Sequence, residues 1–171
     1  MNRNHNSKLF ILALTVFLAV AHVPLGLAVT DKTIKQRIKE AAANNAILRE
    51  AKVGIVVEHG YVVLYGTVRL YSQKMAYERI AWQTMGVVEV DDEIRVVPVR
   101  PLTDTAIKHK IREVVKTYER FHGAQVDIRV EDGSVFLRAT LDHPSDILFL
   151  KHRVAEIEGV LAMEIDAAFR V

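Results

Sequence analysis

The sequence predicts an α+β protein made of two tandem units, each an α-β-β-α-β two-layer sandwich. In each unit, a three-stranded mixed sheet carries both helices on one face. Two observations lead to this prediction: an internal repeat with a period of 73 residues, and a fixed order of helical and alternating apolar patterns within each copy. Sandwiches of this kind bury the apolar face of the sheet under the helices.

A shift of 73 residues superposes the two copies without a gap. The matching pairs include Asp31 and Asp104, Ile34 and Ile107, Val53 and Val126, Gly60 and Gly133, Leu64 and Leu137, and Gly86 and Gly159. The repeat predicts domains over 30–97 and 103–171, joined by a short proline-containing linker over 98–102. Each copy has only about 70 residues, a size at which one core is marginal, so we expect the copies to pack against each other.

Each copy begins with a helix and continues with a hairpin. Thr30-Asp31 and Thr103-Asp104 are helix-start signals, because their side-chain oxygens can accept from the first free backbone amides. Alternating apolar residues then flank His59-Gly60 and Asp132-Gly133, where glycine permits the positive φ of a tight hairpin turn. The sequence therefore predicts two antiparallel strands after the first helix of each copy.

A second helix and a third strand complete each copy. The helices are predicted from about Ser72 to Met85 and from Ser145 to Glu158, with Gly86 and Gly159 as their C-terminal caps. The last strands carry alternating apolar residues, among them Val90 and Ile165. Because each last strand follows a helical crossover, we expect it to run parallel to one strand of the hairpin.

Residues 1–28 have the pattern of a cleavable signal peptide. Arg3 and Lys8 precede an apolar run, Leu9 to Ala21, that is shorter than a membrane-spanning helix requires. Small residues at Gly26 and Ala28 predict cleavage after Ala28, and the alternative is an anchor that is kept. We therefore expect a periplasmic protein. If it binds membrane lipid, it is also a peripheral membrane protein. The chain has no Cys, so no disulfide supports the fold.

The charge balance argues against a nucleic-acid partner. The chain has 23 Lys and Arg and 21 Asp and Glu, a net charge of +2. Loss of Arg3 and Lys8 with the leader makes the remainder neutral, so whole-molecule attraction to nucleic acid is not expected. Any electrostatic function must come from local patches.

The combined pattern resembles the BON domain, the bacterial OsmY and nodulation domain. The resemblance rests on Asp-x-x-Ile at each helix start, on the hairpin pattern from Ile55 to Gly66 and on the Gly-Val before the last strand, found twice over 30–171. The second copy departs from the pattern at Ala139, Met163 and Ala167. The resemblance implies an envelope protein that binds phospholipid surfaces or other envelope proteins, with a role in osmotic stress or envelope maintenance. It implies no catalytic residues and no cofactor.

Basic residues on the first helix of each copy are the candidate lipid-binding site. In the second copy, cations recur every four residues and are expected to form a ladder along one side of the helix. The proposed lipid-binding residues are Lys108, Lys110, Arg112, Lys116 and Arg120, with Lys35 and Lys39 in the first copy. A cationic stripe of this kind suits anionic headgroups. The alternative interpretation is an ordinary solvated helix face.

Aromatic residues gather in the first copy. Tyr61 and Tyr65 share the strand face opposite Val62 and Leu64. We expect that face to pack between the copies, with contact to an external partner as the alternative. Trp82 is expected in the core or at its boundary.

No constellation for catalysis or metal binding is recognisable. His109 and Glu113 have helical i, i+4 spacing, but no third ligand can be identified. The acidic run 91–93 is interpreted as a solvated strand edge that discourages pairing. We therefore predict a protein without enzymatic activity that binds membrane lipid, and the rival hypothesis is a protein-interaction module of the envelope.

Overall fold

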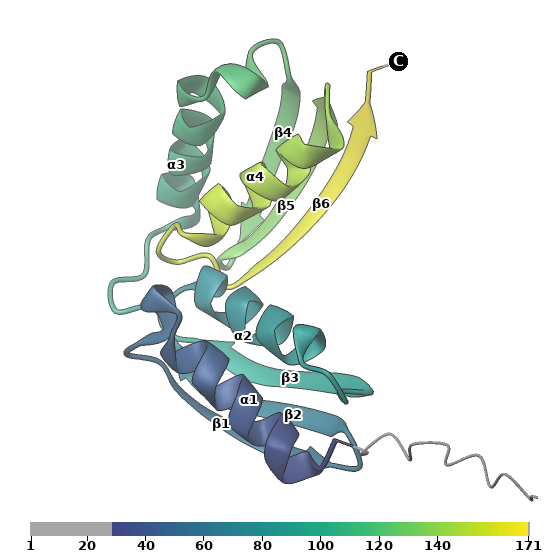
Figure 1. The fold of residues 1–171 in the computed structure, drawn as a ribbon. Coiled ribbons are helices and arrows are strands. Elements are labelled where there is room, and N and C mark those ends of the chain that lie inside the picture. Colours follow the sequence, from purple (N-terminus) through teal and green to yellow (C-terminus); the bar gives the residue numbers. More distant parts are fainter. Residues whose placement is uncertain (1–28, 171) are drawn as a thin grey trace, which may run out of the picture.

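The structure, a computed structural model, describes residues 29–170, so the predicted signal peptide and its cleavage site lie outside the described residues. The chain forms two α/β units, one after the other (Figure 1). The first consists of α1 (Asp31–Ala43), the 3-10 helix η1 (Ala46–Leu48), β1 (Lys52–Glu58), β2 (Tyr61–Val68), α2 (Tyr71–Gln83) and β3 (Glu89–Val96). The second consists of α3 (Asp104–Thr117), the 3-10 helix η2 (Glu119–Phe121), β4 (Gln125–Glu131), β5 (Ser134–Leu141), α4 (Pro144–Ala155) and β6 (Ala162–Phe169).

Each unit is a two-layer sandwich, as predicted. In the first sheet, β1 pairs antiparallel with β2, and β3 pairs parallel with β2. The second sheet repeats this arrangement with β4, β5 and β6. In Figure 1 the helices of both units lie in front of their sheets. The fold class and the parallel third strand are therefore confirmed.

Apolar side chains between the layers form one core in each unit. The cores are equivalent: Ile34, Ile38 and Leu64 are buried in the first unit, and Ile107, Ile111 and Leu137 in the second. Burial of these side chains on one face of each helix accounts for the helical periodicity of the sequence.

The two hairpin turns are tight and are held by an aspartate from the preceding helix. His59 and Gly60 both have positive φ, 52° and 81°, as a two-residue turn of type I′ requires. The Asp31 carboxylate accepts hydrogen bonds from the backbone amides of both, at 2.8 and 2.9 Å. The second unit repeats this contact between Asp104 and its own turn, at 2.9 Å twice. The helix caps themselves are the threonines, since Thr30 Oγ1 accepts from the amide of Thr33.

The second helices end earlier than predicted. α2 ends at Gln83 and α4 at Ala155, so Gly86 and Gly159 are not helix caps. Both glycines instead occupy the turn into the last strand, with φ of 98° and 97°. Helical periodicity continued beyond the true ends because apolar residues of these turns also face the core.

The acidic run 91–93 lies within β3, which is an edge strand as expected. Asp91 and Glu93 are exposed, but the Asp92 side chain is only 12% exposed and points to the helix side. Lys74 of α2 reaches it, with Nζ 3.5 Å from Asp92 Oδ1. The interpretation of the whole run as a solvated edge is therefore wrong for Asp92.

The two units are in contact through Tyr71 rather than through Tyr61 and Tyr65. Tyr71 packs against the core of the second unit. Tyr61 and Tyr65 lie on the open sheet face, 52% and 48% exposed, and the Tyr65 ring covers Gly54 of the neighbouring strand. The expectation that these two tyrosines pack between the copies is therefore wrong, because the sheet face that carries them is left uncovered.

Candidate functional site

The charged residues are divided unequally between the two layers. The four α-helices carry twelve Lys and Arg against six Asp and Glu, a net charge of +6. The six strands carry four Lys and Arg against nine Asp and Glu, a net charge of −5. Because the helices of both units lie on the same side in Figure 1, residues 29–170, which carry no net charge in total, have a cationic helix layer and an anionic sheet layer.

The first helices of the two units carry cations at equivalent positions. A shift of 73 residues relates Lys35 to Lys108, Arg37 to Lys110 and Lys39 to Arg112. Four of these six residues are exposed, and Lys35 and Lys108 are half-buried. None of the six forms an ion pair with a carboxylate within residues 29–170. Their charge is thus available to an external anion.

The predicted ladder is only partly formed. Lys108, Arg112 and Lys116 follow one another at i, i+4 spacing on α3, and Lys116 lies 3.8 Å from Glu113 in an exposed pair. Lys110 is two residues from Lys108, about 200° around the helix, and lines a hollow facing α4. Lys110, expected near the ladder, therefore lies on another flank of α3 from Lys108, Arg112 and Lys116.

Arg120 does not belong to the ladder either. α3 ends at Thr117, and Arg120 lies in η2. Its guanidinium is 3.4 Å from the buried carboxylate of Asp146 and stacks over the Phe149 ring at 4.3 Å. Arg120 therefore ties η2 to α4 and neutralises a buried acid, a structural role that the i, i+4 spacing concealed.

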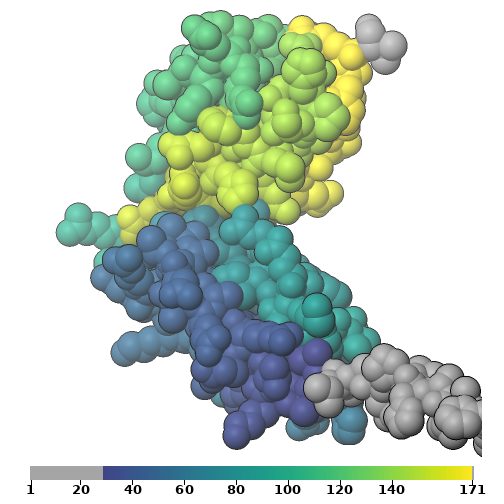
Figure 2. Space-filling model, viewed as in Figure 1, coloured from purple at the N-terminus to yellow at the C-terminus, as the bar shows by residue number. Residues whose placement is uncertain are grey.

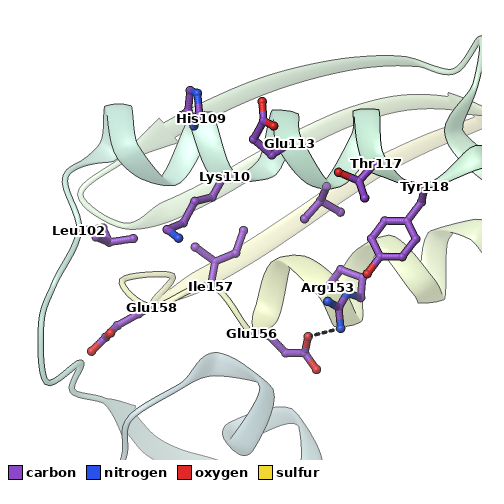
Figure 3. A pocket seen from close by; sticks show the side chains of 11 residues that line it. Leu102, His109, Lys110, Glu113, Thr117, Tyr118, Arg153, Glu156, Ile157 and Glu158 are labelled. Carbon is purple, nitrogen blue, oxygen red and sulfur yellow. Dashed lines mark hydrogen bonds and ion pairs between the residues drawn. The ribbon is translucent and has the colours of Figure 1, made fainter.

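A hollow of about 850 Å³ lies between α3 and α4 (Figure 3). Lys110 on one wall and Arg153 on the other contribute positive charge, and Arg153 pairs with Glu156 at 2.6 Å. Glu113 and Glu158 add negative charge, and the Glu158 carboxylate already accepts from the amide of Arg100 at 2.7 Å. Three carboxylates, with Glu156 as the third, thus face two cations in this hollow, so it does not extend the cationic surface of the helix layer.

A second hollow, the α2–α4 groove, lies where the two units meet. It has a volume of about 450 Å³, and its large apolar lining residues are Ile47, Met75, Trp82 and Leu148. Trp82 is 51% exposed and Leu148 64%. The expectation that Trp82 lies in the core or at its boundary is therefore wrong, because α2 turns this residue toward the second unit rather than toward its own sheet.

The α2–α4 groove is built from equivalent faces of the two helices. Met75 corresponds to Leu148 under the 73-residue shift, and Arg79 corresponds to His152. The same shift relates Glu78 to Lys151, so the two walls carry opposite charges at that position. In Figure 2 the second unit meets the first along this boundary, on the side that carries the helices.

Neither a metal site nor a membrane-spanning helix is found among the described residues. Among residues 29–170, no three His, Cys, Asp or Glu side chains lie close enough together to hold a metal ion. Within that same range, no helix has both the length and the apolar character needed to cross a bilayer. The features described above are surfaces: a cationic helix layer, the α2–α4 groove and an open sheet face.

A comparison with known protein families gives one match, which lies in the first unit. Residues 30–98 match the BON domain. The match begins at the Thr30 cap and ends just after β3, so it spans all the helices and strands of the first unit. No curated protein matches the chain.

Two solved structures that resemble the chain are both of CdsD, a structural protein of the type III secretion system of Chlamydia trachomatis. The first, of the C-terminal domain, is 15% identical with a TM-score of 0.33, and the match covers 78% of this chain and 63% of that one. The second is 11% identical with a TM-score of 0.29, covering 79% and 91%. These values support no inference about function.

Proposed function

We propose that this chain is a non-catalytic envelope protein that binds anionic phospholipid surfaces through its cationic helix layer. It acts as two tandem BON domains, with 103–171 as the second. After export and cleavage behind Ala28, the protein is periplasmic and peripheral on a membrane. The function serves envelope maintenance or the response to osmotic stress.

The separation of charge between the two layers is the observation that carries this proposal. A net charge of +6 on the helices and −5 on the strands orients the molecule with its helices toward an anionic surface. The unpaired cations at equivalent positions of α1 and α3 supply the contacts. Each cation near an anionic membrane surface contributes about 1 kcal/mol.

Co-sedimentation with vesicles tests the proposal. The protein is mixed with phosphatidylglycerol-containing vesicles and with neutral phosphatidylcholine vesicles, at low and high salt. Charge reversal of three exposed cations, Lys39→Glu, Arg112→Glu and Lys116→Glu, removes about 3 kcal/mol and weakens binding at least a hundredfold. Binding of the unaltered protein falls steeply with salt because exposed charges are screened.

A matched control separates helix-layer binding from net charge. Lys52→Glu, Arg95→Glu and Arg138→Glu change the net charge by the same amount, but all three residues are exposed on strands. This variant keeps its affinity if the helix layer is the binding surface. Equal loss of binding in both triple variants, or no binding by the unaltered protein, refutes the proposal.

The open sheet face of the first unit favours a second candidate, a protein-interaction module. Tyr61, Tyr65 and Val56 are exposed there beside the acidic residues of β3. A protein partner that contacts these rings binds with weak dependence on salt, unlike lipid bound through cations. Crosslinking in whole cells, repeated with Tyr61→Ser, tests this candidate.

A further inference from the structure

We infer that the α2–α4 groove is an apolar anchor that enters the interfacial region of an anionic bilayer. This inference rests on the proposed function and deepens it, because it assigns the helix layer a second contact with the same membrane. The cations of α1 and α3 would then meet headgroups, and the groove would meet the boundary between headgroups and acyl chains.

The first support is the gathering of exposed apolar side chains. Ile47, Trp82 and Leu148 are 49%, 51% and 64% exposed, and all three line this one groove. Single exposed apolar residues are common on protein surfaces, but several around one hollow mark a contact site. They come from η1, α2 and α4, so only the folded, two-unit molecule brings them together.

The second support is the position of the groove. α2 and α4 lie in the middle of the helix side, between α1 and α3 (Figure 1). A membrane that contacts the cations of both first helices therefore also meets the groove between them. Arg79 and Lys151 at the groove have stems long enough to extend their charges to phosphate oxygens. Two carboxylates, Glu78 and Glu156, also line the groove, and Glu156 is paired with Arg153 at 2.6 Å.

The chemistry of Trp82 matches this environment. Tryptophan combines a large apolar ring with an N–H donor, and it is enriched where membrane meets water. A half-exposed indole that lines such a groove can place its apolar ring against acyl chains and keep its N–H donor hydrated. An interior role for the ring would require burial, which Trp82 lacks.

The chain contains one tryptophan, so its fluorescence reports on this residue alone. The protein is recovered from the envelope of an exporting host, and its N-terminus is determined by mass spectrometry. It is then titrated with vesicles of phosphatidylglycerol and phosphatidylcholine whose acyl chains carry bromine near the headgroup. We expect a blue shift of the Trp82 emission and quenching by the bromines, in step with co-sedimentation.

Two variants separate a contribution of the groove from a contribution of the opposite layer. Leu148→Ser, at an exposed position of α4, is expected to weaken vesicle binding about tenfold. Tyr61→Ser, at an exposed position of the opposite layer, is expected to leave binding unchanged. Vesicle binding with unchanged Trp82 emission overturns the anchor and leaves the proposed function standing. Absence of vesicle binding overturns both.

Discussion

The half-buried pair of Lys74 and Asp92 allows a sharp prediction, because the second unit has replaced it. The equivalent positions in that unit are Ile147 and Ile165, which pack against its core. The same fold thus accepts either an ion pair or two isoleucines at one place. We predict that the double variant Lys74→Ile, Asp92→Ile is at least as stable as the unaltered protein, whereas each single variant is less stable.

The contacts give the size and order of these effects. Lys74 Nζ donates to the carbonyl oxygens of Asp92 and Ile94 at 3.1 and 2.7 Å, in addition to its contact with the carboxylate. Asp92→Ile leaves those two hydrogen bonds in place and costs about 1–2 kcal/mol. Lys74→Ile instead leaves a largely buried carboxylate whose Oδ2 already has no partner, and costs about 3 kcal/mol. Replacement of both charges removes their desolvation cost, so the double variant is neutral or gains 1 kcal/mol or more.

Urea unfolding of the four proteins closes a double-mutant cycle and gives the coupling energy between the two residues. We expect a coupling of about 3 kcal/mol or more. If the double variant loses as much stability as the two single variants together, the ion pair and the two isoleucines are not interchangeable in this fold. The predicted coupling between Lys74 and Asp92 is then refuted.

Two further predictions concern the hairpin clamp and the contact between units. The clamp is the pair of hydrogen bonds that Asp104 accepts from the amides of the second hairpin turn, and Asp104→Ala should lower the free energy of unfolding by about 2 kcal/mol, measured by thermal unfolding. Asp127→Ala, at an exposed strand position, is the control and should change stability little. Equal losses of stability in the two variants would contradict the role of Asp104. Burial, with the charges of Glu78 and Asp92, raises the pKa of Tyr71 above 10.0. The stability that Tyr71 contributes is therefore fully present below about pH 10 and is lost as the pH rises through its folded pKa, so the unfolding midpoint should fall there less in Tyr71→Phe than in the unaltered protein. An equal fall in both would remove Tyr71 as the cause.

The features that the sequence predicted correctly are those that repeat locally. The turns at His59-Gly60 and Asp132-Gly133 follow from glycine and from the alternating apolar strands on either side. The parallel third strand follows from the helical crossover before it. The hydrogen bonds from the hairpin turns to Asp31 and Asp104 were not predicted. Both aspartates were visible at equivalent positions, but they were explained as helix-start residues, so no contact with a distant turn was expected.

The features that were missed depend on packing between elements distant in sequence. The Asp92 side chain points to the helix side of β3, where it pairs with Lys74 of α2. The run of acidic residues in the sequence did not indicate this partner. Arg120 continues the i, i+4 spacing of the cations but lies beyond the end of α3, where Asp146 binds it. Trp82 lies on a different face of α2 from the buried Tyr77 and Ala81 and lines a groove together with residues of the second unit, which the sequence of α2 alone did not indicate.

Contact between the units matters for the proposed function because it decides whether two cationic helices act together. Tyr71 of the first unit packs against the second unit's core, and the amide of Arg100 donates to Glu158 at 2.7 Å. Because these contacts fix the two units relative to each other, both helix layers lie on one side of the molecule. Under the proposed function, binding of one first helix to a membrane therefore brings the other first helix to the same membrane. The second contact then becomes intramolecular, with an effective concentration far above that of free protein. Under the proposed function, duplication therefore places two cationic first helices on one face, although residues 29–170 as a whole carry no net charge.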